Sequence, residues 1–194
     1  MVDGPERQTD DEQALVARTG RGDQIAFRLL VDAHARRLHA LAWRMLMDGT
    51  EAEDVVQESF ARLWTGAPRW RAGSGSVGGW LARVCTNLCI DRLRRRRFWA
   101  DEEVPDMADD RVAATEAIDA RRLDQAVAAA LAALPDRQRT AIVLTYHEHW
   151  PNAEAAQMMG LHIKAFESLL LRARTALRRA LTARGFDGSE GQAA

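Results

Sequence analysis

Residues 80–97 read WLARVCTNLCIDRLRRRR, and this stretch predicts a helix with two chemically different faces. One face is apolar at helical spacing and consists of Leu81, Val84, Cys85 and Leu88. A neighbouring stripe is polar or aromatic and consists of Trp80, Arg83, Asn87 and Asp91. The end of the stretch is basic and contains Arg92, Arg94, Arg95, Arg96 and Arg97. The apolar face can be buried in a helical bundle, which leaves the other side exposed.

The exposed side has the chemistry of a nucleic-acid binding surface. An indole stacks on bases, an amide hydrogen-bonds to base edges, and arginines bind phosphate. The alternative interpretation is an amphipathic core helix whose basic end is only solvated, because charge runs are common on protein surfaces. The segments around this helix decide between the two interpretations.

Charge is distributed along the chain in blocks. The formal net charge of the 194 residues is −1, which by itself does not favour a nucleic-acid binder. Residues 11–99, however, carry 15 Arg against 10 Asp and Glu, and residues 125–194 have a net charge of +2. Residues 100–124 between them have a net charge of −6. Two basic blocks therefore flank an acidic one, a distribution compatible with binding to nucleic acid.

The composition disfavours several classes of protein. No apolar run reaches the ~20 residues that span a bilayer, and the N-terminus has no signal-peptide core, so we expect a cytoplasmic protein without membrane insertion. Cys85 and Cys89 lie four residues apart with no histidine near them, so we interpret them as reduced core residues and expect no metal and no cofactor. The five histidines form no catalytic constellation, so an enzyme is the class least favoured.

Helical periodicity accounts for most of the first half of the chain. Residues 1–10 are polar and are expected to be frayed. A helical pattern begins at Asp11, breaks at residues 20–23, and resumes in a longer helix that ends at Asp48. The apolar positions of that helix are Phe27, Leu30, His34, Leu38, Leu41 and Met45. Residues 66–79 are rich in Gly, Ser and Arg, and predict a loop before Trp80.

The helix predicted over residues 53–64 has an exposed acidic stripe. Its buried face consists of Val55, Val56, Ser59, Phe60, Leu63 and Trp64. Its exposed stripe consists of Asp54, Gln57, Glu58 and Ala61. Acidic outer faces usually serve solvation, so this pattern alone does not indicate a binding site.

The second half of the chain has the pattern of a helix-turn-helix. Residues 99–122 lose the apolar period and predict an acidic linker. Helices are predicted from Leu123 to Leu134 and, after Pro135, through Thr145. A short helix over residues 153–159, a turn at Gly160 and a longer helix from Ile163 then follow.

The last predicted helix divides into two faces. The apolar face consists of Phe166, Leu170, Ala173 and Leu177. The opposite face consists of Lys164, Ser168, Leu171, Arg172, Thr175 and Arg179. A solvated helix surface has the same pattern. A basic, hydroxyl-bearing face after a glycine turn is nevertheless what entry into the major groove requires, so we favour DNA binding.

The order of these segments resembles the extracytoplasmic-function (ECF, group IV) sigma factors of the sigma-70 family, which direct bacterial RNA polymerase to promoters. EAEDVVQESFARLW (51–64) resembles the segment with which such proteins bind the clamp helices of the polymerase. GGWLARVCTNLCIDRLRRRR (78–97) resembles the helix that recognises and opens the −10 element. LPDRQRTAIVLTYHEHW (134–150) and AEAAQMMGLHIKAFESLLLRARTALRRAL (153–181) resemble the −35-reading helix-turn-helix. The resemblance covers residues 11–183.

The resemblance implies an all-α fold with two small helical domains joined by an acidic linker. These are sigma region 2 at 11–98, the linker at 99–122, sigma region 4 at 123–183, and a tail at 184–194. The implied polymerase-binding residues are Asp54, Gln57 and Glu58. The residues assigned to the −10 element are Trp80, Arg83, Asn87, Arg94 and Arg95, with Asn87 matching an asparagine that holds a flipped base beside residues 70–79. Those assigned to the −35 element are Lys164, Ser168 and Arg172.

The implied partners are the core of bacterial RNA polymerase, promoter DNA and, as for many relatives, an anti-sigma factor. The chain departs from the family pattern at three places. His149-Trp150-Pro151 replaces a common Gly-Leu-Ser run, and His162 stands where Ser or Thr commonly caps the recognition helix. Val77 occupies a position that is often aromatic.

Two other functions fit parts of the pattern. A helix-turn-helix regulator with an unrelated helical sensor domain would bind an operator without polymerase. It leaves the helices over residues 53–64 and 80–97 unexplained. A helical protein that only mimics a sigma factor would not retain the basic face of the last helix.

Overall fold

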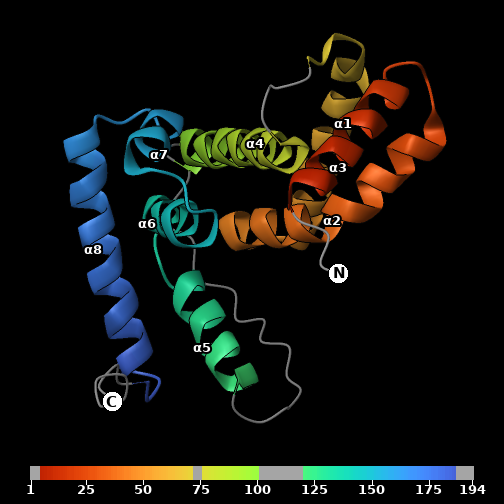
Figure 1. Cartoon of the computed structure of the whole chain (residues 1–194). Coiled ribbons are helices and arrows are strands. Elements are labelled where there is room, and N and C mark those ends of the chain that lie inside the picture. Colours follow the sequence, from red (N-terminus) through yellow and green to blue (C-terminus); the bar gives the residue numbers. More distant parts are fainter. Residues whose placement is uncertain (1–4, 72–75, 101–119, 187–194) are drawn as a thin grey trace. The chain divides into compact units, whose positions relative to one another are not determined.

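The computed structural model describes residues 5–71, 76–100 and 120–186, with side chains over 11–71, 76–96 and 124–186. These residues are all-α and contain no strand, which confirms the predicted fold class (Figure 1). The chain divides into two compact units, Met1–Asp91 and Arg92–Ala194. The domain boundaries proposed from the sequence stay a prediction. Most of the predicted linker and of the predicted tail lies outside the described residues.

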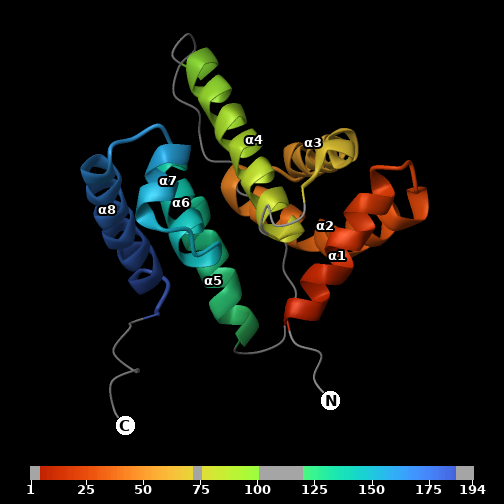
Figure 2. The same cartoon turned by 45° about the horizontal axis from the view of Figure 1, so that its top comes forward.

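The first unit is a bundle arranged around one long helix, α2. Its elements are α1 (Pro5–Thr19), α2 (Gln24–Leu46), α3 (Gly49–Gly66), the 3-10 turn η1 (Ala67–Arg69) and the first part of α4 (Val77–Ala100). Helix α2 contacts both α1 and α3, as the two views in Figures 1 and 2 show. The Sγ atom of Cys85 lies 3.7 Å from the backbone oxygen of Leu38, which places α4 against α2 as well. The largest fully buried side chains here include Val16, Leu30, Leu38, Leu41, Met45, Leu46, Val55, Leu63, Val77 and Leu81.

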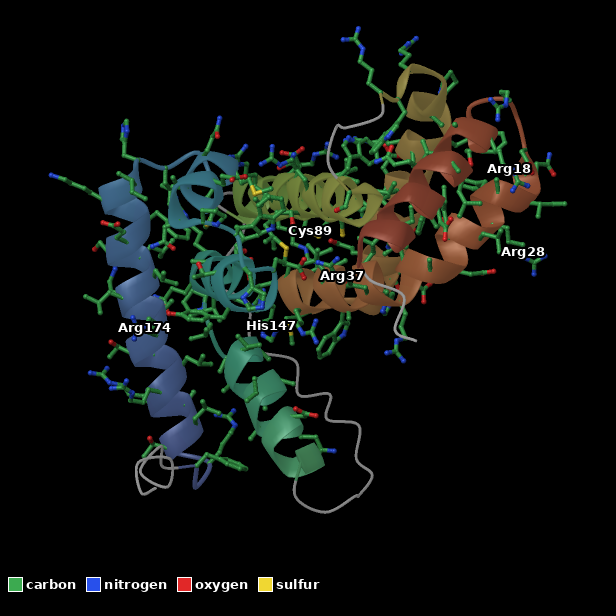
Figure 3. The ribbon with its side chains drawn as sticks, in the orientation of Figure 1. Arg18, Arg28, Arg37, Cys89, His147 and Arg174 are labelled. Carbon is green, nitrogen blue, oxygen red and sulfur yellow. The ribbon has the colours of Figure 1, made fainter. Side chains whose placement is uncertain are left out.

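Two aspartates set the starts of α2 and α3. Oδ1 of Asp23 accepts hydrogen bonds from the backbone N–H groups of Ile25 and Ala26, both at 3.0 Å. Arg18 donates through Nε to Oδ2 of the same carboxylate at 2.9 Å (Arg18 is labelled in Figure 3). The backbone hydrogen bond from Ala26, together with Arg18, holds the pKa of Asp23 below its usual value. Asp48 caps α3 in the same way, so the breaks predicted at residues 20–23 and at Asp48 are confirmed.

Several helices begin earlier than the sequence pattern predicts: α3 at Gly49, α5 at Ala120, and most clearly α1 and α4. Helix α1 begins at Pro5, not at Asp11, because proline suits the first helical position and a polar turn carries no apolar period. Helix α4 begins at Val77, not at Trp80. Its first turn is capped by Ser76, whose Oγ accepts a hydrogen bond from the N–H of Gly79 at 3.1 Å. The loop predicted over residues 66–79 is correspondingly shorter, and residues 72–75 lie outside the described part.

The second unit packs its last helix against the three before it. Its elements after α4 are α5 (Ala120–Ala132), α6 (Asp136–Ile142), the π-helical segment η2 (Val143–His147), α7 (Asn152–Met158) and α8 (Ile163–Thr182). Helix α8 contacts α5, α6 and α7, and it runs beside them in Figures 1 and 2. The core contains Ala130, Leu131, Leu134, Ile142, Leu144, Ala156, Phe166, Leu170 and Ala173.

The segment between α6 and α7 differs from the helix predicted there. The α-helix ends at Ile142, and the chain continues with the wider π-helical turn, in which Glu148 N–H donates to the Val143 oxygen at 3.1 Å. His149 follows with a φ of 55°, in the left-handed region that favours glycine. A glycine would adopt this φ without strain, whereas His149 carries a Cβ atom.

A buried arginine holds the turn between α5 and α6. The Arg139 side chain donates through Nη1 to the backbone oxygen of Leu134 at 2.9 Å and pairs through Nη2 with Asp136. Arg139 is only 4% exposed, so its charge is compensated inside the turn and not by water. The sequence pattern did not predict a buried charge here.

Candidate functional site

Helix α3 presents the polar stripe predicted on its outer face. Asp54, Gln57 and Glu58 are all exposed, whereas Val55 and Leu63 are fully buried. Glu58 forms an i,i+4 ion pair with Arg62 on the same helix, with Oε1 2.9 Å from Nε. The stripe therefore offers carboxylates and an amide, and one of the carboxylates is shared with an arginine.

Aromatic contacts fix α3 against α2 and so set the direction of this stripe. The ring centroid of Phe27 in α2 lies 5.0 Å from that of Trp64 and 6.3 Å from that of Phe60, and both pairs are edge-to-face. Phe60 and Trp64 lie one turn apart on the same face of α3, so rotation of the helix about its axis would move both rings away from Phe27.

Helix α4 presents the predicted stripe, but its buried face differs in detail. Arg83, Asn87 and Asp91 are exposed and Trp80 is half-buried, as the pattern predicts. The fully buried positions are Val77, Leu81, Cys85, Thr86 and Cys89. Val84 and Leu88, which were assigned to the apolar face, are only half-buried. The buried face is rotated toward the i,i+4 row that contains Cys85, whose Sγ contacts the Leu38 oxygen of α2.

The tryptophan before α4 is held in a way that the sequence did not predict. Trp70, which follows η1, donates its indole N–H to Oε1 of Gln13 at 2.7 Å. Its ring lies edge-to-face with that of Trp80, with 5.6 Å between centroids. A tryptophan inside a Gly- and Arg-rich stretch was the only sequence signal for this cluster.

The basic end of α4 follows the stripe along the helix. Arg94 and Arg95 are exposed, as expected for phosphate contacts, while Arg92 and Arg96 are half-buried. The side chain of Arg97 lies outside the described residues.

The turn between α7 and α8 has the geometry predicted for a helix-turn-helix. Gly160 has a φ of 64°, which is the left-handed conformation that glycine adopts without strain. Leu161 N–H donates to the Ala156 oxygen at 2.9 Å and Gly160 N–H donates to the Gln157 oxygen at 3.1 Å. This pair of hydrogen bonds closes the end of α7 and redirects the chain into α8.

Helix α8 carries the predicted polar face. Lys164, Ser168 and Arg172 are exposed, and Leu171 beside them is 64% exposed. Phe166 and Leu170 on the opposite side are buried. His162 precedes the helix without a side-chain cap hydrogen bond, as expected from its poor capping chemistry, so the first N–H groups of α8 donate no hydrogen bond to its side chain.

Cys85 and Cys89 are free and buried on α4 (Cys89 is labelled in Figure 3). Over the described ranges, no group of His, Cys, Asp and Glu side chains is arranged to hold a metal ion. In the same part of the chain, no helix is both long and apolar enough to cross a membrane.

Comparison with known proteins assigns both units to one family. Residues 30–98 match the Sigma-70 region 2 family, and residues 124–177 match Sigma-70 region 4. The ECF RNA polymerase sigma factor SigW of Bacillus subtilis is 30% identical over 172 residues, covering 83% of this chain and 91% of that protein. The ECF RNA polymerase sigma factor SigM of Mycobacterium tuberculosis H37Rv is 33% identical over 181 residues, covering 92% and 88%. The chain belongs to the ECF RNA polymerase sigma factors.

Solved structures agree with the fold of this ECF sigma factor. CnrH, solved in complex with the cytosolic domain of CnrY, is 30% identical with a TM-score of 0.56, covering 89% of this chain and 98% of that one. The sigma factor RpoE of Bartonella quintana, solved with the anti-sigma factor NepR, has a TM-score of 0.58 over 80% of this chain and 96% of that one. At 24% identity, RpoE supports the fold alone. Helix α3 lies inside the region 2 match, and α7 lies inside the region 4 match.

Proposed function

We propose that this ECF sigma factor binds the core of bacterial RNA polymerase, directs it to specific promoters and helps to melt the −10 element. The observation that carries the proposal is the pairing of two exposed faces in one chain. One is the polar stripe of α4 in region 2, which consists of Trp80, Arg83, Asn87 and Asp91. The other is the polar face of α8 in region 4, which contains Lys164, Ser168 and Arg172. Each face is backed by a buried apolar face that holds its helix in the fold.

The exposed stripe of α3 is the proposed polymerase contact. Asp54, Gln57 and Glu58 can pair with basic and amide groups of a partner without disturbing the core, because that part of the helix is anchored by other, buried residues, among them Val55, Phe60 and Leu63. Glu58 would exchange its pairing with Arg62 for a pairing across the interface. An exposed intrahelical pair is weak, so this exchange costs little.

The stripe of α4 is the proposed −10 contact. Trp80 offers an aromatic surface for stacking on a base, and Arg83 offers a cation for phosphate. Asn87 offers an amide that both donates to and accepts from the edge of an extruded base. Arg94 and Arg95, further along the helix, would bind backbone phosphates and so fix the register of the strand.

The N-terminal part of α8 is the proposed −35 contact. Lys164 and Arg172 lie two helical turns apart, with Ser168 between them, so all three can face the same groove. Arg172 can bind guanine through two hydrogen bonds. Ser168 can donate to or accept from a base edge, and Lys164 can contact a phosphate or a guanine.

We also place the chain in group IV, in the cytoplasm and under the control of an anti-sigma factor. The matched regions 2 and 4 are separated only by residues 99–123, which is shorter than the ~50 residues of a small domain. A sigma factor acts on polymerase and DNA, which are cytoplasmic in bacteria, and supplies no catalytic group of its own. The anti-sigma partner rests on the resemblance to relatives that are held inactive by one.

Run-off transcription with core polymerase and a pool of promoter candidates tests the proposal. We expect discrete transcripts that require both proteins and share a −10 and a −35 sequence. A helix-turn-helix regulator without sigma activity would instead bind duplex DNA alone and yield no transcript. Transcription that is independent of the added chain would contradict the proposal.

A further inference from the structure

A hydrogen bond joins α1 to the segment in front of α4. The indole N–H of Trp70 donates to Oε1 of Gln13 at 2.7 Å, between residues 57 positions apart in sequence. Trp70 is half-buried, and a half-buried indole N–H needs such a partner because it has lost part of its access to water. The bond therefore selects one orientation of the Trp70 ring.

The backbone that leads to Trp70 is held against the end of α1. A Cβ atom at Gly20 would lie 2.8 Å from the backbone oxygen of Ala67 in η1, so only glycine permits this approach. Trp70 N–H also donates to that Ala67 oxygen, at 3.1 Å. Main chain and side chain of Trp70 are thus fixed at separate points, by Ala67 and by Gln13.

The ring held in this way supports Trp80, the first residue of the α4 stripe. The two indoles meet edge-to-face at 79° with centroids 5.6 Å apart, so any rotation of Trp70 changes the surface that Trp80 packs against. Trp80 is half-buried, and one side of its ring is occupied by Trp70. Its orientation is therefore set from outside α4.

We propose that Gln13 is a positioning residue of the −10 interface, acting through Trp70 on the indole of Trp80. The inference rests on the proposed function, in which Trp80 and Asn87 face the melted strand. Stacking depends on the tilt of the aromatic plane, so loosening Trp70 weakens the discrimination between bases without removing any group that contacts DNA. Helix α1 thereby contributes to promoter specificity, although none of its side chains needs to reach the promoter.

The experiment compares base selection by holoenzymes that contain matched variants. Gln13→Met removes the acceptor at nearly constant size, Gln13→Glu keeps an acceptor oxygen, and Trp70→Phe removes the N–H but keeps an aromatic ring. Gln24→Met is the same substitution at an exposed position of the same unit. Each holoenzyme captures members of a single-stranded DNA pool randomised across the −10 region, and the captured strands are sequenced. Core-polymerase affinity is measured in parallel, because a merely structural role would lower it too.

We expect Gln13→Met and Trp70→Phe each to lower the enrichment of the preferred base about threefold to tenfold, which corresponds to one hydrogen bond. Polymerase affinity stays at the wild-type level. Gln13→Glu and Gln24→Met select bases as the wild type does. The double variant Gln13→Met, Trp70→Phe loses no more than Trp70→Phe alone, since both changes remove the same bond.

Wild-type selection by Gln13→Met, or additive losses in the double variant, would overturn the inference while the proposed function stands. A wild-type holoenzyme that binds core polymerase but enriches no base would overturn both, because α4 would then have no −10 role.

Discussion

The guanidinium of Arg139 lies inside the turn between α5 and α6, where its Nη1 is 2.9 Å from the backbone oxygen of Leu134. We predict that Arg139→Met destabilises the second unit by about 2–3 kcal/mol, because the Leu134 oxygen and the Asp136 carboxylate both lose a charged donor. Native-state hydrogen exchange of the α6 and α8 amides measures this in the full chain.

The matched control is Arg137→Met, which makes the same change two residues earlier at an exposed position. Surface substitutions of this kind change stability by no more than about 0.5 kcal/mol. Equal exchange rates in the two variants would mean that the buried pairing of Arg139 contributes nothing to the stability of the turn.

The amide of Asn87 is predicted to act in promoter opening and not in folding. Since Asn87 is exposed on α4, Asn87→Ala changes the stability of the first unit by no more than about 0.5 kcal/mol. Extruding a base costs a few kcal/mol, and hydrogen bonds that form only after extrusion offset part of that cost. Holoenzyme with this variant therefore binds duplex promoter but forms open complex poorly, as permanganate footprinting of unpaired thymines would report.

A template with a pre-melted −10 region provides the control within the same assay. The variant recovers part of its activity there, because opening no longer needs the missing hydrogen bonds. If Asn87→Ala opens duplex promoter as the wild type does, the −10 base is held by another residue.

Reversing the charge of the α3 stripe is predicted to weaken polymerase binding. Asp54→Lys combined with Glu58→Lys costs about 1–3 kcal/mol of affinity for core polymerase, because the reversed charges would meet like charges of the partner. The contacts of Phe27 with Phe60 and Trp64 remain, so near-ultraviolet circular dichroism stays that of the wild type. Asp32→Lys, at an exposed position of α2, is the control for added positive charge. An anisotropy titration in which the double variant and the wild type coincide would remove this stripe from the interface.

Binding measurements can distinguish whether Arg172 contacts a base or a phosphate. Its Nε donates to the Ser168 backbone oxygen at a long 3.3 Å, a bond that is readily exchanged for DNA. Arg172→Ala costs about 1–3 kcal/mol and relaxes specificity at one base pair if the side chain reads a base. If it binds phosphate, affinity falls uniformly and the salt slope falls by about one. Arg174→Ala, on the other side of α8, is the matched control, and filter binding at two salt concentrations separates these outcomes.

The sequence predicted best those helices whose two faces differ most. Helices α3 and α8 alternate buried apolar and exposed polar residues at a clear helical period, so Leu63 and Phe166 were assigned to the core and Asp54 and Lys164 to the surface, as the structure has them. Helix ends marked by Asp23, Asp48 and Gly160 were likewise predictable, because capping and left-handed turns depend on local chemistry.

Helix α4 was harder because apolar residues occur on more than one of its sides. Val84 and Leu88 fit an apolar face as well as Cys89 does, and a sequence period does not reveal which row meets the neighbouring helix. The contact between Cys85 and Leu38 decides it, and that contact joins residues 47 positions apart. The buried Arg139 and the bond between Gln13 and Trp70 were missed for related reasons. A buried charge does not follow the rule that charged residues lie on the surface, and a hydrogen bond between distant residues produces no periodic pattern in the sequence.

Cys85 and Cys89 are the two cysteines of the whole sequence, and both are fully buried in α4. A thiol reagent in solution therefore reaches a sulfur atom only when the packing around α4 opens. The rate of alkylation therefore measures how often region 2 opens in the full-length chain. The measurement needs neither an attached label nor separation of the two regions. Slower alkylation upon addition of a partner would identify that partner as one that stabilises region 2.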